Sequence, residues 1–132
     1  MTAPAPGMSD ADLAAALAET AGALLLGVRQ SKLLSGKALG VAGDQTANQF
    51  LCHTIRAQRP DDGLLSEECT DTDERLGKSR VWIIDPVDGT REFGEGRTDW
   101  AVHIAMTVDG RPEIGAVALP GLGLVLRSDR PM

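Results

Sequence analysis

The stretch that most constrains the fold runs from Val81 to Phe93 and reads VWIIDPVDGTREF. It opens with four apolar residues in a row, which is typical of a strand buried on both faces. Pro86 has no N–H to donate and therefore ends the hydrogen bonding of this strand, and Asp88-Gly89 predicts a turn. We expect a central strand that ends at Asp85, with two carboxylates at its carboxyl end, where sheet proteins tend to build their sites.

The two carboxylates repel each other and are costly to desolvate unless a cation lies between them. Mg²⁺ is a simple candidate, because it binds one or two carboxylates together with waters and substrate phosphate oxygens. The structural alternative is a turn in which Asp85 and Asp88 accept hydrogen bonds from backbone N–H groups. An EF-hand fits poorly, because its ligand positions and its closing Glu are absent.

Two helices are predicted before this strand. Ser9 is a good N-cap for a helix that runs to about Gln30, and the side chains that we place along one side of it are Leu13, Leu17, Leu24, Leu25 and Val28. The Gly- and Lys-containing segment 31–43 is interpreted as a loop. Asp44 is then expected to be the N-cap of a second helix over about 45–58.

The remaining elements are predicted to be strands. A short strand over 63–66 delivers Glu67 to its end. From Trp100 to Val108 large and small residues alternate, which favours a half-buried strand. Asp109-Gly110 is a hairpin signal, and return strands follow at 114–119 and 122–126. The order of elements predicts an α+β fold, in which two N-terminal helices pack on a largely antiparallel sheet.

Composition and charge limit the class of protein. The 132 residues suit one domain over 9–132, after a Pro- and Ala-rich tail over 1–8 that we expect to be disordered. A net charge of −6 argues against a nucleic-acid partner. Cys52 and Cys69 have no metal-ligand spacing and are expected to be reduced thiols. With no evident secretory signal and no expected membrane span, a cytoplasmic location is predicted.

The motifs Asp85-Pro86-Val87-Asp88-Gly89-Thr90 and Glu67-Glu68 resemble the signature of the Mg²⁺-dependent, lithium-sensitive phosphatase superfamily that contains the inositol monophosphatases. The continuation Arg91-Glu92-Phe93 is more similar to the CysQ-type 3'(2'),5'-bisphosphate nucleotidases, as are Ala42-Gly43-Asp44 and Asp99-Trp100-Ala101-Val102-His103. The resemblance runs from about Ala11 to Arg127. Family members are considerably longer, so we expect a truncated, N-terminal half of their layered sandwich.

The resemblance implies a role for each motif residue. The family site holds two or three Mg²⁺ ions, and Asp85 would bridge the first and the second. Glu67 and the Val87 carbonyl would help to hold the first ion. Asp88 would hold the second. Asp44 and Thr90 would orient the attacking water. Gly89 and Thr90, with Asp88, would bind the substrate phosphate. Glu68 and His103 are not expected to take part directly.

The implied function is removal of the 3'-phosphate from 3'-phosphoadenosine 5'-phosphate, or from its sulfated relative, in sulfur assimilation. Four basic residues could contact the second phosphate of such a substrate, although exposed basic residues usually have no specific role: Lys32, Lys37, Arg91 and Arg97. An inositol or sugar monophosphatase of the same superfamily is one alternative, and a catalytically inactive truncated fragment is another. The sequence does not decide the oligomeric state, and a homodimer stays among the expected assemblies.

Overall fold

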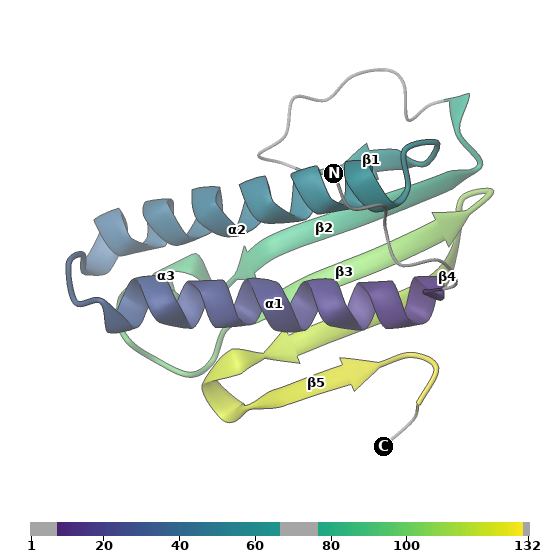
Figure 1. Ribbon diagram of the computed structural model, residues 1–132. Coiled ribbons are helices and arrows are strands. Elements are labelled where there is room, and N and C mark those ends of the chain that lie inside the picture. Colours follow the sequence, from purple (N-terminus) through teal and green to yellow (C-terminus); the bar gives the residue numbers. More distant parts are fainter. Residues whose placement is uncertain (1–7, 67–76, 131–132) are drawn as a thin grey trace.

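The structure is a computed structural model, and it describes residues 8–66 and 77–130. Two long helices come first and a five-stranded sheet follows (Figure 1). In chain order the elements are α1 (Asp10–Gln30), α2 (Gly36–Gln58), β1 (Gly63–Leu65), β2 (Arg80–Asp88), α3 (Thr90–Gly94), β3 (Ala101–Val108), β4 (Arg111–Leu119), the 3-10 turn η2 (Pro120–Leu122) and β5 (Leu124–Arg127).

The sheet has the strand order β1-β2-β3-β4-β5. Among the described strands the β1–β2 pair is parallel, and the other three neighbouring pairs are antiparallel. Helices α1 and α2 run in opposite directions across one face of the sheet, α1 over β3 and β4 and α2 over β2 (Figure 1). The predicted α+β fold, with a helical layer on a largely antiparallel sheet, is confirmed.

Helix α1 begins where the sequence predicts, because the Ser9 side chain accepts a hydrogen bond from the Asp12 N–H at 3.0 Å. Leu13, Leu17 and Leu25 are buried in the core, whereas Leu24 is exposed, contrary to its predicted place on the buried side. By length and composition alone α1 could cross a membrane, but the core helix of a globular protein passes the same test. Its buried face packs on the sheet and on α2.

Helix α2 corrects two predictions. Segment 31–43 is not a loop throughout, because the helix already begins at Gly36. Asp44 is therefore an interior residue of α2 rather than its N-cap, and Ser35 takes the N-cap position. Two of the glycines that suggested a loop, Gly40 and Gly43, serve helix packing instead, since a Cβ on Gly43 would lie 2.6 Å from the ring of Phe93.

Strand β2 also runs further than predicted. Pro86 does not end it; the strand reaches Asp88, and its register against β3 shifts between Asp85 and Asp88. Such an irregularity accommodates a proline without a ladder hydrogen bond and turns the strand locally. The two carboxylates therefore lie on one continuous strand end, as does the carbonyl of Val87.

The hairpin signal at Asp109-Gly110 is confirmed. Both residues have positive φ, 51° and 78°, as a two-residue turn between β3 and β4 requires. The alternation from Trp100 onward is confirmed too, since Val102 and Ile104 are buried under the helices.

A network of charged side chains joins the start of α1 to the far end of α2 and the start of β2. Asp10 accepts hydrogen bonds from Arg59 and from Arg80, each at 2.9 Å. Asp62 accepts from Arg80 at 3.0 Å and from the Trp82 indole at 2.9 Å. Burial raises the pKa of Asp10, but the hydrogen bonds and charges of Arg80 and Arg59 outweigh it, so this pKa lies below its ordinary value.

Three further expectations meet the structure only in part. Cys52 is disulfide-bonded, so the prediction of a reduced thiol is wrong at this position. A disulfide needs two close and correctly oriented cysteines, which sequence separation does not reveal; the cysteine argument for a cytoplasmic location is thereby removed. Of the predicted tail over 1–8 only Met8 is described, and its carbonyl accepts from Arg59 at 2.8 Å. Glu67 and Glu68 lie outside the described residues.

Candidate active site

The first feature of the site is a hydrogen bond between Asp44 and Thr90, 46 residues apart in the sequence. The Thr90 hydroxyl donates to Asp44 Oδ2 at 3.1 Å, and the Val87 carbonyl lies 3.2 Å from the same hydroxyl. Asp44 comes from the N-terminal half of α2, and Thr90 is the first residue of α3. The resemblance paired these two residues, and the structure brings them together.

Two glycines of α2 allow this approach. A Cβ on Gly40 would lie 2.8 Å from the Thr90 methyl carbon, and one on Gly43 would lie 2.6 Å from Phe93. Either contact is closer than real Cβ atoms come to a neighbour. The absence of both side chains therefore lets α3 pack directly against the backbone of α2.

The second feature is a pair of carboxylates around His103. Asp85 and His103 are directly opposite partners on β2 and β3, so their side chains lie on the same face of the sheet. His103 Nε2 lies 3.1 Å from Asp88 Oδ2, and both side chains are largely exposed. Asp88 contacts the imidazole and Asp85 is its cross-strand partner, so His103 belongs to the site, although the sequence indicated no direct part for it.

The predicted turn after β2 is present. Gly89 has φ 95°, a value that favours glycine, and its carbonyl accepts from the Phe93 N–H at 2.9 Å to begin α3. A side chain at this position would also approach the Asp99 carbonyl to 3.1 Å. The turn brings Thr90 back toward α2, whereas binding of phosphate by Gly89 and Thr90 stays a prediction.

Asn48 is a buried polar residue that sequence reasoning missed. It lies one helical turn after Asp44 on α2, is buried, and accepts a hydrogen bond from the Ser66 hydroxyl. This buried hydrogen bond holds Ser66 against α2. Ser66 is the residue immediately before Glu67 in the sequence. An Asn one turn after a candidate catalytic Asp is the only signal that the sequence offered.

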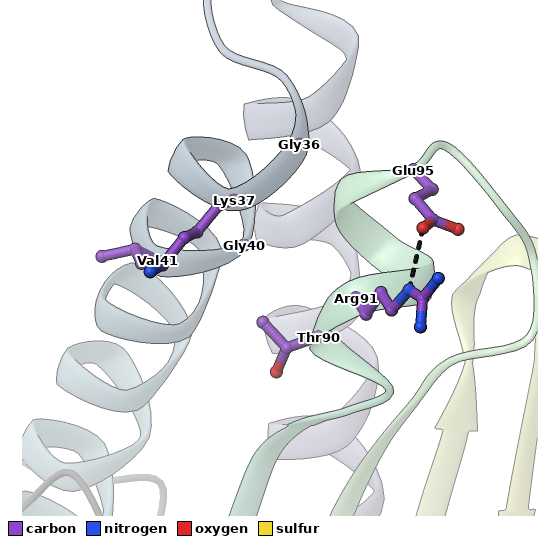
Figure 2. A pocket seen from close by; sticks show the side chains of 7 residues that line it. All are labelled: Gly36, Lys37, Gly40, Val41, Thr90, Arg91 and Glu95. Atoms are coloured by element: carbon purple, nitrogen blue, oxygen red, sulfur yellow. Dashed lines mark hydrogen bonds and ion pairs between the residues drawn. The ribbon is translucent and has the colours of Figure 1, made fainter.

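A pocket opens beside Thr90, between the first turns of α2 and α3 (Figure 2). It holds about 400 Å³. Its lining comes from Gly36, Lys37, Gly40, Val41, Thr90, Arg91 and Glu95. Arg91 donates to Glu95 at 3.0 Å, and this contact raises the pKa of the guanidinium above its ordinary value. The pocket is adjacent to the Asp44–Thr90 pair and is bordered by two basic side chains.

The donor set indicates which ion the site could accept. Carboxylates of Asp85 and Asp88 and the carbonyl of Val87 are hard oxygen ligands, the kind that Mg²⁺ prefers. Within residues 8–66 and 77–130 no group of three His, Cys, Asp or Glu side chains is assembled to hold a metal. The third carboxylate that the resemblance implies, Glu67, lies outside these ranges.

Comparison with known proteins identifies the class that this fold and site define. The inositol monophosphatase family matches residues 10–129, and the chain belongs to that family. Among solved structures, staphylococcal IMPase-II superposes with a TM-score of 0.78 at 27% sequence identity, over 89% of this chain and 43% of that one.

Two similar relatives are named as phosphatases of bisphosphate nucleotides. A 3'-phosphoadenosine 5'-phosphate phosphatase of Mycobacterium leprae is 54% identical over 134 residues, which cover 92% of this chain and 49% of that protein. The 3'(2'),5'-bisphosphate nucleotidase CysQ of Salmonella typhimurium is 37% identical over 61% of this chain and 33% of its own length. The chain therefore spans about half the length, or less, of these relatives.

Proposed function

We propose that this chain carries the first half of the active site of a Mg²⁺-dependent phosphomonoesterase that removes the 3'-phosphate of 3'-phosphoadenosine 5'-phosphate. The observation that carries the proposal is the Asp44–Thr90 hydrogen bond at 3.1 Å, beside the strand end that bears Asp85 and Asp88. The resemblance gives these two residues the role of orienting water, and their contact across 46 residues of sequence supports that role. The names of two similar relatives, a 3'-phosphoadenosine 5'-phosphate phosphatase and a 3'(2'),5'-bisphosphate nucleotidase, support the choice of substrate.

Asp85 and Asp88, with the Val87 carbonyl, would hold the metal ions, since all three lie at the end of β2 and offer hard oxygen ligands. Bound there, Mg²⁺ would neutralise phosphate charge and lower the pKa of a coordinated water. Glu67 is expected to complete the ligand set.

The chain's own residues would orient the attacking water. The Thr90 hydroxyl donates to Asp44 and thereby keeps the carboxylate in one orientation. Asp44 would accept a hydrogen bond from the attacking water. This bond would align a lone pair of the water oxygen with phosphorus. Since Gly89 begins the turn before α3, backbone N–H groups at 89–90 would contact the phosphate oxygens.

A bisphosphate is favoured over a monophosphate by the two basic side chains of the pocket beside Thr90. Lys37 and Arg91 border this pocket, and Glu95 offsets one of their two charges. The remaining positive charge would attract the phosphate that is not cleaved. A nucleotide with two phosphates would therefore use the reaction centre and the pocket at once.

The experiment measures phosphate release by the purified 132-residue chain from 3'-phosphoadenosine 5'-phosphate, with Mg²⁺ and with Mg²⁺ removed by chelation. We expect release by this chain alone to be low, since it carries about half of the active site. Any release should depend on Mg²⁺ and be inhibited by lithium, and Lys37→Ala and Arg91→Ala should slow it more with the bisphosphate than with a monophosphate. Equal slowing for both substrates would contradict the assignment of the pocket. Release that persists after complete chelation would contradict the metal-dependent reaction.

An inositol monophosphatase is the second candidate, because solved structures of that activity share the fold over most of this chain. Faster release from inositol 1-phosphate than from the nucleotide would favour it. No release from either substrate would favour the third possibility, that the chain is inactive by itself. This chain covers only 49% of the length of the Mycobacterium leprae relative.

A further inference from the structure

Two buried aromatic rings lie close to the Asp44–Thr90 pair: one is on α3, the helix that Thr90 begins. Phe93 of α3 and Trp100, which precedes β3, are in edge-to-face contact with ring centroids 4.8 Å apart and an interplanar angle of 72°. Phe93 is fully buried and Trp100 almost so. This geometry is favourable for aromatic pairs beyond the area that they bury.

Arg29, near the end of α1, lies over both rings. Its guanidinium carbon is 5.5 Å from the Phe93 centroid and 5.3 Å from that of Trp100, within cation–π range of each. It also donates to the Arg97 carbonyl at 2.7 Å, the same carbonyl that accepts from the Trp100 indole at 2.9 Å. One half-buried side chain thus contacts α3, the start of β3 and the segment between them.

The Phe93 ring, which Arg29 covers on one side, also packs against α2. Phe93 contacts Gly43, the residue immediately before Asp44. Phe93 also lies one turn after Thr90 on the short helix α3, with its N–H bonded to the Gly89 carbonyl. Phe93 and Thr90 therefore belong to one short helix that packs against α2, which carries Gly43 and Asp44 (Figure 1 shows α3 beside the start of α2).

We infer that Arg29 is a positioning residue: it holds Phe93 against Gly43 and thereby keeps Thr90 within hydrogen-bond distance of Asp44. The inference rests on the proposed function only for its consequence in turnover. Arginine suits the task because its planar fork can stack on the rings and donate to the carbonyl together. Lysine would keep the charge over the rings, and methionine would keep only the length.

The first test observes the hydrogen bond directly. The Thr90 methyl resonance is recorded by NMR in the wild-type chain and in Asp44→Asn, which defines the shift caused by weakening the bond. Arg29→Met should move this resonance in the same direction as Asp44→Asn, and Arg29→Lys should restore part of the wild-type position. Arg56→Met, at an exposed arginine of α2, is the matched control and should leave it in place.

The second test observes turnover at a temperature at which every variant is fully folded by circular dichroism. Arg29→Met should lower kcat by about tenfold with KM little changed, because misalignment of the water-orienting pair affects the reaction step and not substrate binding. Arg29→Lys should fall between, and Arg56→Met should equal the wild type.

The outcomes separate the inference from the proposed function. A wild-type chain that releases no phosphate contradicts the proposed function for this chain, while the Thr90 resonance still decides the role of Arg29. An unmoved Thr90 resonance in Arg29→Met overturns the inference, whatever the activity. A lower melting temperature with unchanged kcat and an unmoved resonance would assign Arg29 to stability alone.

Discussion

Replacing Gly43 by Ala tests the close packing of α2 against α3. The new Cβ would lie 2.6 Å from Phe93 Cε2 and 3.1 Å from Leu25 Cδ2. Ordinary contact begins at 3.4 Å, so the ring and α2 would have to separate by about 0.8 Å. Neither neighbour can give way freely, since Phe93 and Leu25 are both completely buried.

Two opposing terms set the change in stability. Alanine in a helix interior is favoured over glycine by about 1 kcal/mol. Overpacking a filled core costs about 1–3 kcal/mol. Gly27→Ala is the matched control, because Gly27 is also helical and a Cβ added there would have nothing within 4 Å. Gly27→Ala should gain the helix term alone, so the two variants should differ by about 1–3 kcal/mol.

The assay is urea unfolding of the wild type and the two alanine variants, followed by circular dichroism. Gly27→Ala should shift the midpoint upward and Gly43→Ala should not. The Asp44–Thr90 bond, 3.1 Å in the wild type, would lengthen to about 3.9 Å if the whole separation of about 0.8 Å were transmitted, beyond hydrogen-bond range. A Gly43→Ala variant as stable as Gly27→Ala, with wild-type turnover, would refute this account of the helix contact.

Three further predictions concern single carboxylates. Asp10→Asn should lower the free energy of unfolding by about 1–2 kcal/mol near neutral pH, because two arginines lose a charged acceptor. The folded-state pKa of Asp10 is lowered, so this contribution is present above the unfolded pKa and disappears as the pH falls through the folded one; urea titrations at neutral and acid pH check this, and a pH-independent difference would contradict it. Asp44→Asn and Thr90→Val should be coupled by about 1 kcal/mol in a double-mutant cycle of unfolding free energies, since they share one hydrogen bond; strictly additive effects would mean that the bond is not formed. Asp85→Asn should reduce phosphate release to background in any active preparation, whereas Asp61→Asn, at an exposed turn, should not; near-normal release by Asp85→Asn would exclude it as a metal ligand.

The elements that local chemistry alone specifies were predicted correctly from the sequence. Ser9 caps α1 because a hydroxyl can accept from the first free N–H groups, whatever the rest of the chain does. Asp109-Gly110 adopts a positive-φ turn because few other pairs can. Alternation from Trp100 onward needs no distant contact to be recognised.

The errors arose where a residue has two possible physical roles. Gly40 and Gly43 were interpreted as loop residues, but a helix that must approach another closely also uses glycine. Asp44 was interpreted as an N-cap for the same reason, since the helix was expected to begin after the glycines. Pro86 was expected to end its strand, but an irregular register lets the strand pass it.

The candidate site was predicted through resemblance rather than geometry. No local pattern indicates that Asp44 and Thr90 meet, because their contact depends on how two helices pack. The contacts of Arg29 and Asn48 were not predicted at all, because each depends on partners far away in the chain. The Asp88–His103 contact crosses a shift in the β2–β3 register, which pairs His103 with Asp85 and Asp88 with Ala101, and this irregularity was not predicted.

The charged residues at the two ends of α1 contact different parts of the molecule. Asp10, at its start, joins the charged network, and Arg29, near its end, holds the aromatic pair. About nineteen residues of helix separate them, a distance of about 29 Å. Since the contacts described for the two residues have no partner in common, the energetic effects of substitutions at the two ends should simply sum. Substitutions around Asp10 that raise the melting temperature should therefore leave the contacts of Arg29 with Phe93 and Trp100 unchanged.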